Sequence, residues 1–217
     1  MATITAVEIQ KRRPDRVNVD LDGEFAFSLS GMLAAGLKVG AQLSPEQIAS
    51  LQARDADEAA YQRALRLLSL RDRSEAELRI HLRKHKTPED VLERTLARLR
   101  EHRHADDAKF ARTWIENRTA FRPRGRRALA WELRQKGIPA DVAEAALSGL
   151  DEVALAHQAG LKKARQLDAA DWQDFRTKVA AYLARRGFPS SIIASTVSDL
   201  WTETHAGQPS LQTEEIP

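Results

Sequence analysis

Two histidines have the spacing of a zinc-binding pair. His81 and His85 are four residues apart, which places both rings on the same face of a helix. A zinc hydrolase also needs a glutamate directly after its first histidine, and here that position is Leu82. The neighbouring Arg83 and Lys84 would repel a dication. The sequence therefore predicts structural or surface histidines and no metal site.

Asp106 and Asp107 are a second pair that could do chemistry, since neighbouring carboxylates can serve as acid and base or as metal ligands. They also stand where a helix is expected to begin, and carboxylates there cap the helix and complement its dipole. The glycines fall singly, so there is no glycine-rich phosphate loop, and the chain has no cysteine. We therefore expect a protein that is not an enzyme and that uses no cofactor.

Positive charge is distributed unevenly along the chain. The whole sequence carries +3, but residues 118–136 hold seven lysines and arginines against Glu132 alone. Residues 1–60 hold six basic residues against nine acidic ones. Such asymmetry indicates a polyanion or an acidic protein surface as partner, although a solvated helix face would show the same composition.

The elements that carry these residues form an internal repeat. Segment 124–150 predicts a helix, a tight break at Gly137 and a second helix that has Pro139 in its first turn. The same pattern recurs around Leu82 and Leu183, which lie 51 and 50 residues from Leu133 of this segment. We call these three residues the anchor leucines of the repeat. Such a period indicates an array of similar units.

The repeat determines the expected fold, which is mostly α-helical. Three-helix units over residues 57–104, 105–150 and 151–204 are each too small to be stable alone, so they are expected to stack into an elongated, curved array. Lys86 of the first unit stands where the others have glycine, and a different turn is expected there. Residues 205–217 are expected to form a disordered tail.

Residues 1–56 predict a β-rich extension with short helices. Asp22-Gly23 is a strong signal for a two-residue hairpin turn, and the alternation after it places Phe25, Phe27 and Leu29 in register on one face. The strands of this antiparallel sheet are expected at residues 3–10, 16–21 and 24–29. The helices are expected at residues 33–40 and 45–54.

The sequence gives no sign of a membrane protein. No apolar run approaches the roughly 18–20 residues that a membrane helix needs, and no apolar segment follows a basic start at the N-terminus. The lack of cysteine fits a reducing compartment. We expect a soluble, cytoplasmic protein that makes no membrane contact.

Basic residues recur on the middle helix of every three-helix unit and on the loop before it. Because the units repeat, these residues are expected to line one face, where arginines can hold phosphates or carboxylates with paired donors. We call this set the basic stripe and take it as the candidate site for a partner or for DNA. Its members are Arg71, Arg73, Arg83, Lys84, Arg122, Arg124, Arg126, Arg127, Arg134, Lys136, Arg185 and Arg186.

The tryptophans offer a further binding possibility. Trp114, Trp172 and Trp201 lie on apolar helical faces and are expected in the core. Trp131 lies among the arginines and could stack on a base or on an arginine. Core packing is the favoured interpretation for Trp131 as well.

Four strings in this order resemble the bacterial regulatory protein RecX. They are A-L-R-L-L-S-L-R-D-R-S-E-A-E-L (64–78), D-D-A-K-F-A (106–111), the R-G…L…E-L-R-Q-K-G-I pattern (124–138) and Y-L-A-R-R-G-F (182–188). The resemblance covers residues 57–203, and the N-terminal segment is similar to the extension of longer family members.

The resemblance implies a modulator of RecA, the recombinase that forms filaments on single-stranded DNA. It implies a protein that binds RecA and the RecA–DNA filament and inhibits recombinase and coprotease activity in recombination and the SOS response. We expect the chain to be a monomer. Two other interpretations stay open at this point. The chain could be a DNA-binding module that acts without RecA, or a helical adaptor for another protein.

Overall fold

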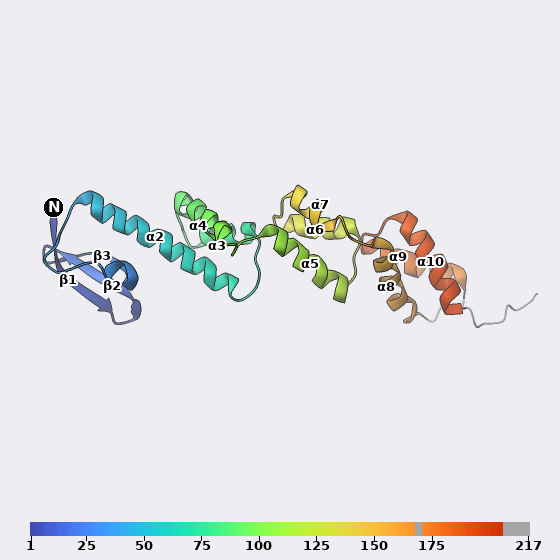
Figure 1. Cartoon of the computed structure of the whole chain (residues 1–217). Helices are drawn as coiled ribbons and strands as arrows, with labels where there is room; N and C mark the ends of the chain where they lie inside the picture. The colour runs from blue at the N-terminus through green and yellow to red at the C-terminus, as the bar shows by residue number, and fades with distance from the viewer. Residues whose placement is uncertain (168–170, 206–217) are drawn as a thin grey trace, which may run out of the picture. The chain divides into compact units, whose positions relative to one another are not determined.

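The computed structural model describes residues 1–167 and 171–205 of the chain (Figure 1). The fold is mostly α-helical with antiparallel strands at the N-terminus, as predicted. It divides into two compact units, one from Met1 to Asp106 and one from Asp107 onward. No helix among the described residues is long and apolar enough to cross a membrane. The predicted tail lies outside the described residues except for His205.

The first unit begins with a four-stranded antiparallel sheet in the order β3-β2-β1-β4. The strands are β1 (Ala2–Gln10), β2 (Arg13–Leu21), β3 (Glu24–Ser30) and β4 (Gln42–Leu43). Asp22 and Gly23 make the predicted turn, and both have the positive φ that two-residue hairpin turns require. The prediction of three strands missed β4, a two-residue strand that pairs with the start of β1.

An irregularity in β3 turns Phe25 away from the core. Val19 pairs with Phe27, but its neighbour Asp20 pairs with Phe25, so Ala26 is an extra residue in β3. A bulge of this kind interrupts the alternation of faces along a strand. Phe27 is buried and Phe25 is 63% exposed. The prediction that Phe25 is in register with Phe27 and Leu29 is therefore wrong.

One long helix, α2 (Pro45–Leu68), connects the sheet to the first three-helix repeat. It begins as predicted, with the Ser44 hydroxyl accepting from the Gln47 N–H and the Gln47 side chain accepting from the Ser44 N–H. The predicted end near residue 54 is wrong. No glycine or proline follows for more than a turn, and the chain continues in helix through the expected boundary.

Asp55, in the middle of α2, ties that helix to the sheet. Its buried carboxylate accepts from Arg16 Nη1 at 2.7 and 3.0 Å and from the Ser30 N–H at 2.7 Å. Between β3 and α2 the helix α1 (Gly31–Ala34) is shorter than the predicted helix over residues 33–40. The chain turns instead towards Gly40, which has a φ of 89°.

Three helical repeats follow, each with its own apolar core. Repeat 1 consists of the end of α2 with α3 (Glu75–Lys84) and α4 (Glu89–Glu101). Repeat 2 consists of α5 (Asp107–Phe121), α6 (Arg126–Gln135) and α7 (Ala140–Leu147). Repeat 3 consists of α8 (Glu152–Ala164), α9 (Trp172–Arg185) and α10 (Ser190–His205).

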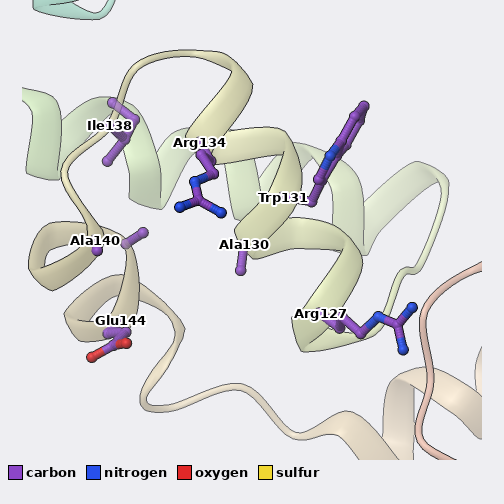
Figure 2. Close-up of a pocket in the computed structure, with 8 residues that line it drawn as sticks. Arg127, Ala130, Trp131, Arg134, Ile138, Ala140 and Glu144 are labelled. Carbon is purple, nitrogen blue, oxygen red and sulfur yellow. The ribbon is translucent and has the colours of Figure 1, made fainter.

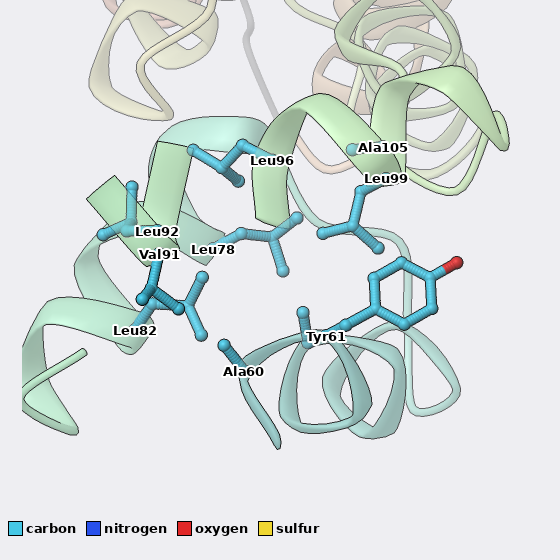
Figure 3. Close-up of a cluster of buried hydrophobic side chains, with 10 residues drawn as sticks. Ala60, Tyr61, Leu78, Leu82, Val91, Leu92, Leu96, Leu99 and Ala105 are labelled. Carbon is cyan, nitrogen blue, oxygen red and sulfur yellow. The ribbon is translucent and has the colours of Figure 1, made fainter. Parts of the chain in front are cut away.

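The cores place the anchors of the sequence repeat at equivalent positions. Leu82, Leu133 and Leu183 are each fully buried, in three separate clusters. In repeat 1, Leu82 packs with Leu78 and leucines of α4 over Ala60 and Tyr61 of α2 (Figure 3). The repeat read from the sequence is thus a repeat of buried positions.

The turn after the middle helix has one conformation in all three repeats. Gly137 and Gly187 have φ values of 74° and 84°, and Lys86 has a φ of 56°. In each repeat the residue after this position donates its N–H to the carbonyl of the anchor leucine, at 3.0 to 3.4 Å. The expectation of a different turn in repeat 1 is wrong, since the lysine adopts the left-handed conformation that glycine adopts elsewhere. Pro139 precedes α7 at the N-cap, one residue earlier than predicted.

Repeats 2 and 3 lie in the same unit and meet at a close backbone contact. The Gly125 N–H donates to the Arg186 carbonyl at 3.0 Å, and Arg186 Nη1 donates to the Pro123 carbonyl at 3.0 Å. A Cβ atom on Gly125 would overlap the Gly187 carbonyl group, with the carbon at 2.6 Å. Only glycine at position 125 permits this approach.

Candidate partner-binding surface

The two histidines with zinc-like spacing lie against each other at the end of α3, with His81 in the helix and His85 at its C-cap, and their ring planes are tilted by 47°. Their ring centroids are 4.5 Å apart. Burial lowers the pKa of His81, and His85 and nearby cations such as Arg63 and Arg73 lower that pKa further. No group of three or more histidines and carboxylates within the described residues is placed to hold a metal ion.

Half of the basic stripe is available to a partner. Six of its side chains are exposed and make no ion pair or hydrogen bond with any residue that the structure describes. They are Lys84, Arg122, Arg126, Arg127, Arg134 and Arg185. Four of the six belong to α6 and the loop before it, so repeat 2 carries most of the available members of the stripe.

Of the other six members, five are engaged within the protein and Arg73 is partly buried. Arg71 and Arg83 form ion pairs with Glu77 and Glu89, at 2.8 and 2.5 Å. Arg186 holds the Pro123 carbonyl and stacks on Tyr182, with its guanidinium carbon 4.4 Å from the ring centroid. Two further members are partly buried, Arg73, whose Nε has no hydrogen-bond partner, and Lys136, which lies over the Trp114 ring at 5.1 Å.

Arg124 belongs to a buried network centred on Glu132. Glu132 Oε2 accepts from Arg118 Nε at 2.7 Å and from Trp114 Nε1 at 2.8 Å. Arg124 Nη1 lies 2.7 Å from Oε1, an ion-pair distance without the direction of a hydrogen bond. The Glu132 side chain is only 7% exposed. Sequence reasoning missed this site, although a single carboxylate within a basic segment is a signal that could have revealed it.

The tryptophans divide differently from the prediction. Trp131 is 61% exposed and Trp172 is 38% exposed, so the core interpretation is wrong for these two. Trp114 and Trp201 are partly buried against their cores, as expected. The periodicity of α6 explains Trp131, because Leu129 and Leu133 point inward and a residue two positions from each lies on the opposite face.

Beside Trp131 the surface is hollowed between α6 and α7 (Figure 2). We call this hollow, of about 430 Å³, the α6–α7 groove. Its lining consists of Arg127, Ala130, Trp131, Arg134, Ile138, Ala140, Ala143 and Glu144. Figure 2 shows the Arg134 guanidinium directed into the space between the two helices, with Ala140 and Glu144 on the α7 side. A second hollow shares Arg127, Ala130 and Glu144 and extends to Phe188 and Pro189 of repeat 3.

In repeat 1 the equivalent surface between α3 and α4 is bridged by ion pairs. Arg79 of α3 donates to both carboxylate oxygens of Glu93 on α4, at 2.8 and 3.0 Å. Arg83 likewise donates to both oxygens of Glu89, at 2.5 and 3.2 Å. These hydrogen bonds are the largest cause of a raised pKa for both arginines and of a lowered pKa for Glu89.

In repeats 2 and 3 these bridges are missing. The counterparts of Arg79 and Glu89, 51 residues further on, are Ala130 and Ala140, so Arg134 has lost its partner. Repeat 3 has small residues at the corresponding places, and a hollow of about 570 Å³ lies there between α9 and α10. Both grooves are open. Among the described residues, the groove of repeat 2 is lined by unpaired charges of both signs, whereas the hollow of repeat 3 is lined by Arg176 and no carboxylate.

Four family models match the chain in order. The model for the regulatory protein RecX N-terminal domain matches residues 2–44. Those for the first, second and third three-helix domains of RecX match residues 60–99, 106–147 and 151–197.

Proteins with the name regulatory protein RecX resemble the chain over most of its length. That of Bacillus velezensis is 32% identical over 201 residues, which cover 89% of this chain and 75% of the relative. That of Prosthecochloris aestuarii is 38% identical over 143 residues, which cover 66% of this chain and 94% of the relative.

Solved structures agree with this relationship. The crystal structure of a regulatory protein RecX is 30% identical and covers 92% of this chain and 100% of its own, with a TM-score of 0.73. The crystal structure of RecX from Lactobacillus salivarius, 24% identical, shares the fold with a TM-score of 0.63 over 68% of this chain and 97% of its own. With its repeats, its N-terminal sheet and these relatives taken together, the chain belongs to the RecX family of regulatory proteins.

Proposed function

We propose that this chain is a non-catalytic regulator that binds RecA and the RecA filament on single-stranded DNA. In this role it inhibits recombinase and coprotease activity in recombination and the SOS response, as a monomer in the cytoplasm. The observation that carries the proposal is membership of the RecX family.

The available cations support this role. The proposal assigns partner contact to the six exposed members of the basic stripe, with Arg126, Arg127 and Arg134 of α6 as the main group. The engaged members contribute to the fold, either within their own repeat or, for Arg186, between repeats 3 and 2. Exposed arginines with no intramolecular partner are free to hold phosphates or carboxylates of another molecule.

The direct test is titration of the purified chain into RecA bound to single-stranded DNA. We expect ATP hydrolysis and strand exchange to fall as the chain approaches a stoichiometric ratio to RecA. A reaction that continues at its full rate at that ratio would contradict the proposal.

Charge reversal on α6 tests whether this helix contacts the RecA filament. The triple variant Arg126→Glu, Arg127→Glu and Arg134→Glu should weaken filament binding by at least about tenfold while the fold is kept, because exposed substitutions usually change stability by about 0.5 kcal/mol or less. Arg124 is left intact because it contacts the buried Glu132.

A matched control reverses three exposed cations of the N-terminal region. Lys11, Arg12 and Lys38 have no ion pair or hydrogen bond from their side chains to any described residue. Their reversal changes the net charge by the same amount. Equal loss of binding in both triple variants would show a general charge effect in place of a surface on α6.

The same arginines favour a second candidate function, a DNA-binding module that acts without RecA. It predicts tight binding of the chain alone to single-stranded DNA, with an affinity that falls steeply as salt rises. Loss of three phosphate contacts would reduce the slope of log K against log salt by about 2. DNA binding with no effect on RecA would favour this candidate, and neither behaviour would favour an adaptor for another protein.

A further inference from the structure

Repeat 1 shows which groups fill the groove between a middle helix and the helix after it. There, two carboxylates of α4 meet two arginines of α3, each with a pair of hydrogen bonds. Glu89 provides the carboxylate for Arg83, and Arg79 provides the cation for Glu93. The charged groups between α3 and α4 therefore find their partners within the protein itself.

The α6–α7 groove retains one half of each of these pairs. Arg134 is the counterpart of Arg83, and Glu144 is the counterpart of Glu93. Their partners are replaced by alanine, at positions 140 and 130. Neither Arg134 nor Glu144 makes an ion pair or hydrogen bond through its side chain with any described residue, and the two do not pair with each other.

We propose that the α6–α7 groove docks a protein surface that carries a carboxylate for Arg134 and a basic side chain for Glu144. The incoming groups take the places that Glu89 and Arg79 occupy in repeat 1. The proposal rests on the proposed function, in which that surface belongs to RecA, and it assigns this groove to the protein of the filament and not to the DNA.

The charges that line the α6–α7 groove favour a protein surface over a nucleic acid strand as the occupant. A nucleic acid strand presents one negative charge per nucleotide. Glu144 lines the same groove as Arg134 and would repel such a strand. In the adjoining hollow Glu144 and Glu152 offset the charges of Arg126 and Arg127, so that hollow offers a strand no net positive charge. A protein surface can present opposite charges a few ångströms apart, as α3 and α4 do.

The apolar part of the lining fits the same occupant. Ala130, Ile138, Ala140 and Ala143 form the aliphatic part of the lining. Trp131 stands at the edge with more than half of its surface exposed. Exposed tryptophan beside arginine is the composition that dominates binding energy at protein–protein interfaces.

Closing the groove with the ion pairs of repeat 1 tests the proposal. The double variant Ala130→Arg, Ala140→Glu leaves the net charge unchanged and supplies the two missing partners from within the chain. We expect it to bind RecA filaments at least about tenfold more weakly than the parent chain, because the polar groups of the groove are already satisfied.

The matched control is Ala184→Arg, Ser190→Glu, which places one such pair across the groove of repeat 3. It also leaves the net charge unchanged, and binding is expected to stay within about threefold of the parent chain. A second variant, Arg134→Glu with Glu144→Arg, reverses the polarity of the open groove without filling it. It should weaken filament binding to a similar degree, and it tests the proposal if the closed variant fails to fold.

The outcomes separate the two proposals. Loss of filament binding in the closed and reversed variants, with unchanged binding to single-stranded DNA alone, supports the protein-docking groove. Unchanged filament binding in a folded closed or reversed variant overturns it, as does an equal loss in the repeat 3 control. Loss of DNA binding alone overturns the assignment to protein. If the parent chain does not bind RecA filaments at all, the proposed function and this inference fall together.

Discussion

Repeats 1 and 2 share a backbone pattern and place their ion pairs on opposite sides of the middle helix. In repeat 1 the arginines of α3 reach outward to the glutamates of α4. In repeat 2 the carboxylate of Glu132 lies on the inner side of α6, where it holds Arg118 and Trp114 of α5. The outer groove of repeat 2 is left with unpaired charges.

The difference shows how a repeat can keep its fold and change its surface. The buried anchor leucines and the turn after them are the same in both repeats, so both form the same helical hairpin. Stabilising contacts that repeat 1 makes on its exposed face are replaced in repeat 2 by contacts beneath α6. Exposed pairs contribute little to stability, whereas a buried carboxylate with several donors is costly to disturb.

The largest expected effect comes from Glu132→Ala. It leaves Arg118 and the Trp114 indole N–H without an acceptor in a mostly buried place, and we expect the free energy of unfolding to fall by about 3 kcal/mol. All four tryptophans lie in the second unit, so urea unfolding followed by tryptophan fluorescence reports on it.

The exposed counterpart in repeat 1 provides the contrast. Glu89→Ala removes a pair in which both side chains are more than half exposed. Circular dichroism should show an unfolding midpoint close to that of the parent chain. A larger loss from Glu89→Ala than from Glu132→Ala would reverse the comparison.

Gly125→Ala should have the next largest effect. The equivalent N-cap in repeat 1 is Ser74, whose hydroxyl accepts from the Glu77 N–H. Position 125 gives up that side chain because Gly187 of repeat 3 lies against it, and Glu152 accepts from the Arg126 N–H instead. A methyl group there is expected to cost about 1–3 kcal/mol through overpacking.

Gly149→Ala is the control for that substitution. An added Cβ at position 149 meets nothing within 4 Å, and its φ is not in the left-handed region. Its urea midpoint should match or slightly exceed that of the parent chain. If the two variants lose equal stability, the contact between repeats 2 and 3 contributes nothing specific.

The shared turn predicts a smaller, reciprocal pair of effects. Gly137→Lys imposes on repeat 2 the left-handed lysine of repeat 1 and should destabilise the second unit by about 1 kcal/mol. Lys86→Gly relieves the same strain in repeat 1, but the gain is smaller because glycine also increases the freedom of the unfolded chain. Thermal unfolding of both variants checks the two signs, and a stabilised Gly137→Lys variant would contradict the argument.

The smallest expected effect is a pH dependence that arises from His81 in the first unit. Burial is the main cause of the lowered pKa of His81, so the folded state binds its proton less readily than the unfolded state. Stability is then fully present above the unfolded pKa of about 6.5 and is lost as pH falls through the lower folded value. Circular dichroism melts between about pH 7.5 and 5 should show this loss for the parent chain.

The variant His81→Gln identifies the source of that loss. The equivalent position in repeat 2 is Glu132, so repeat 2 has no histidine there that could cause the same loss. The carboxylates with lowered pKa, such as Glu89 and Asp90, titrate below this pH range. An unchanged pH dependence in His81→Gln would show that another group is responsible.

The sequence alone was sufficient for the family, the fold class and the three helical repeats. The burial of Leu82, Leu133 and Leu183 could be predicted because the spacing of apolar residues on one helix face follows from local helix geometry. The turns after these leucines could be predicted because they depend on residues only a few positions away. The Asp22-Gly23 turn is local in the same sense. The prediction was wrong where the local pattern did not decide the structure. The bulge in β3 exposes Phe25, and α2 continues beyond residue 54.

The candidate surface could be predicted only in part. Composition identified the basic segment, but a count of arginines does not distinguish those that face solvent from those that hold a carboxylate. Arg124 and Arg134 are ten residues apart on one segment, and only tertiary structure brings Glu132 to the first and leaves the second unpaired. The sequence determined where positive charge accumulates, because charge is a property of composition. Tertiary structure decided which charges remain available, because pairing depends on distances between helices.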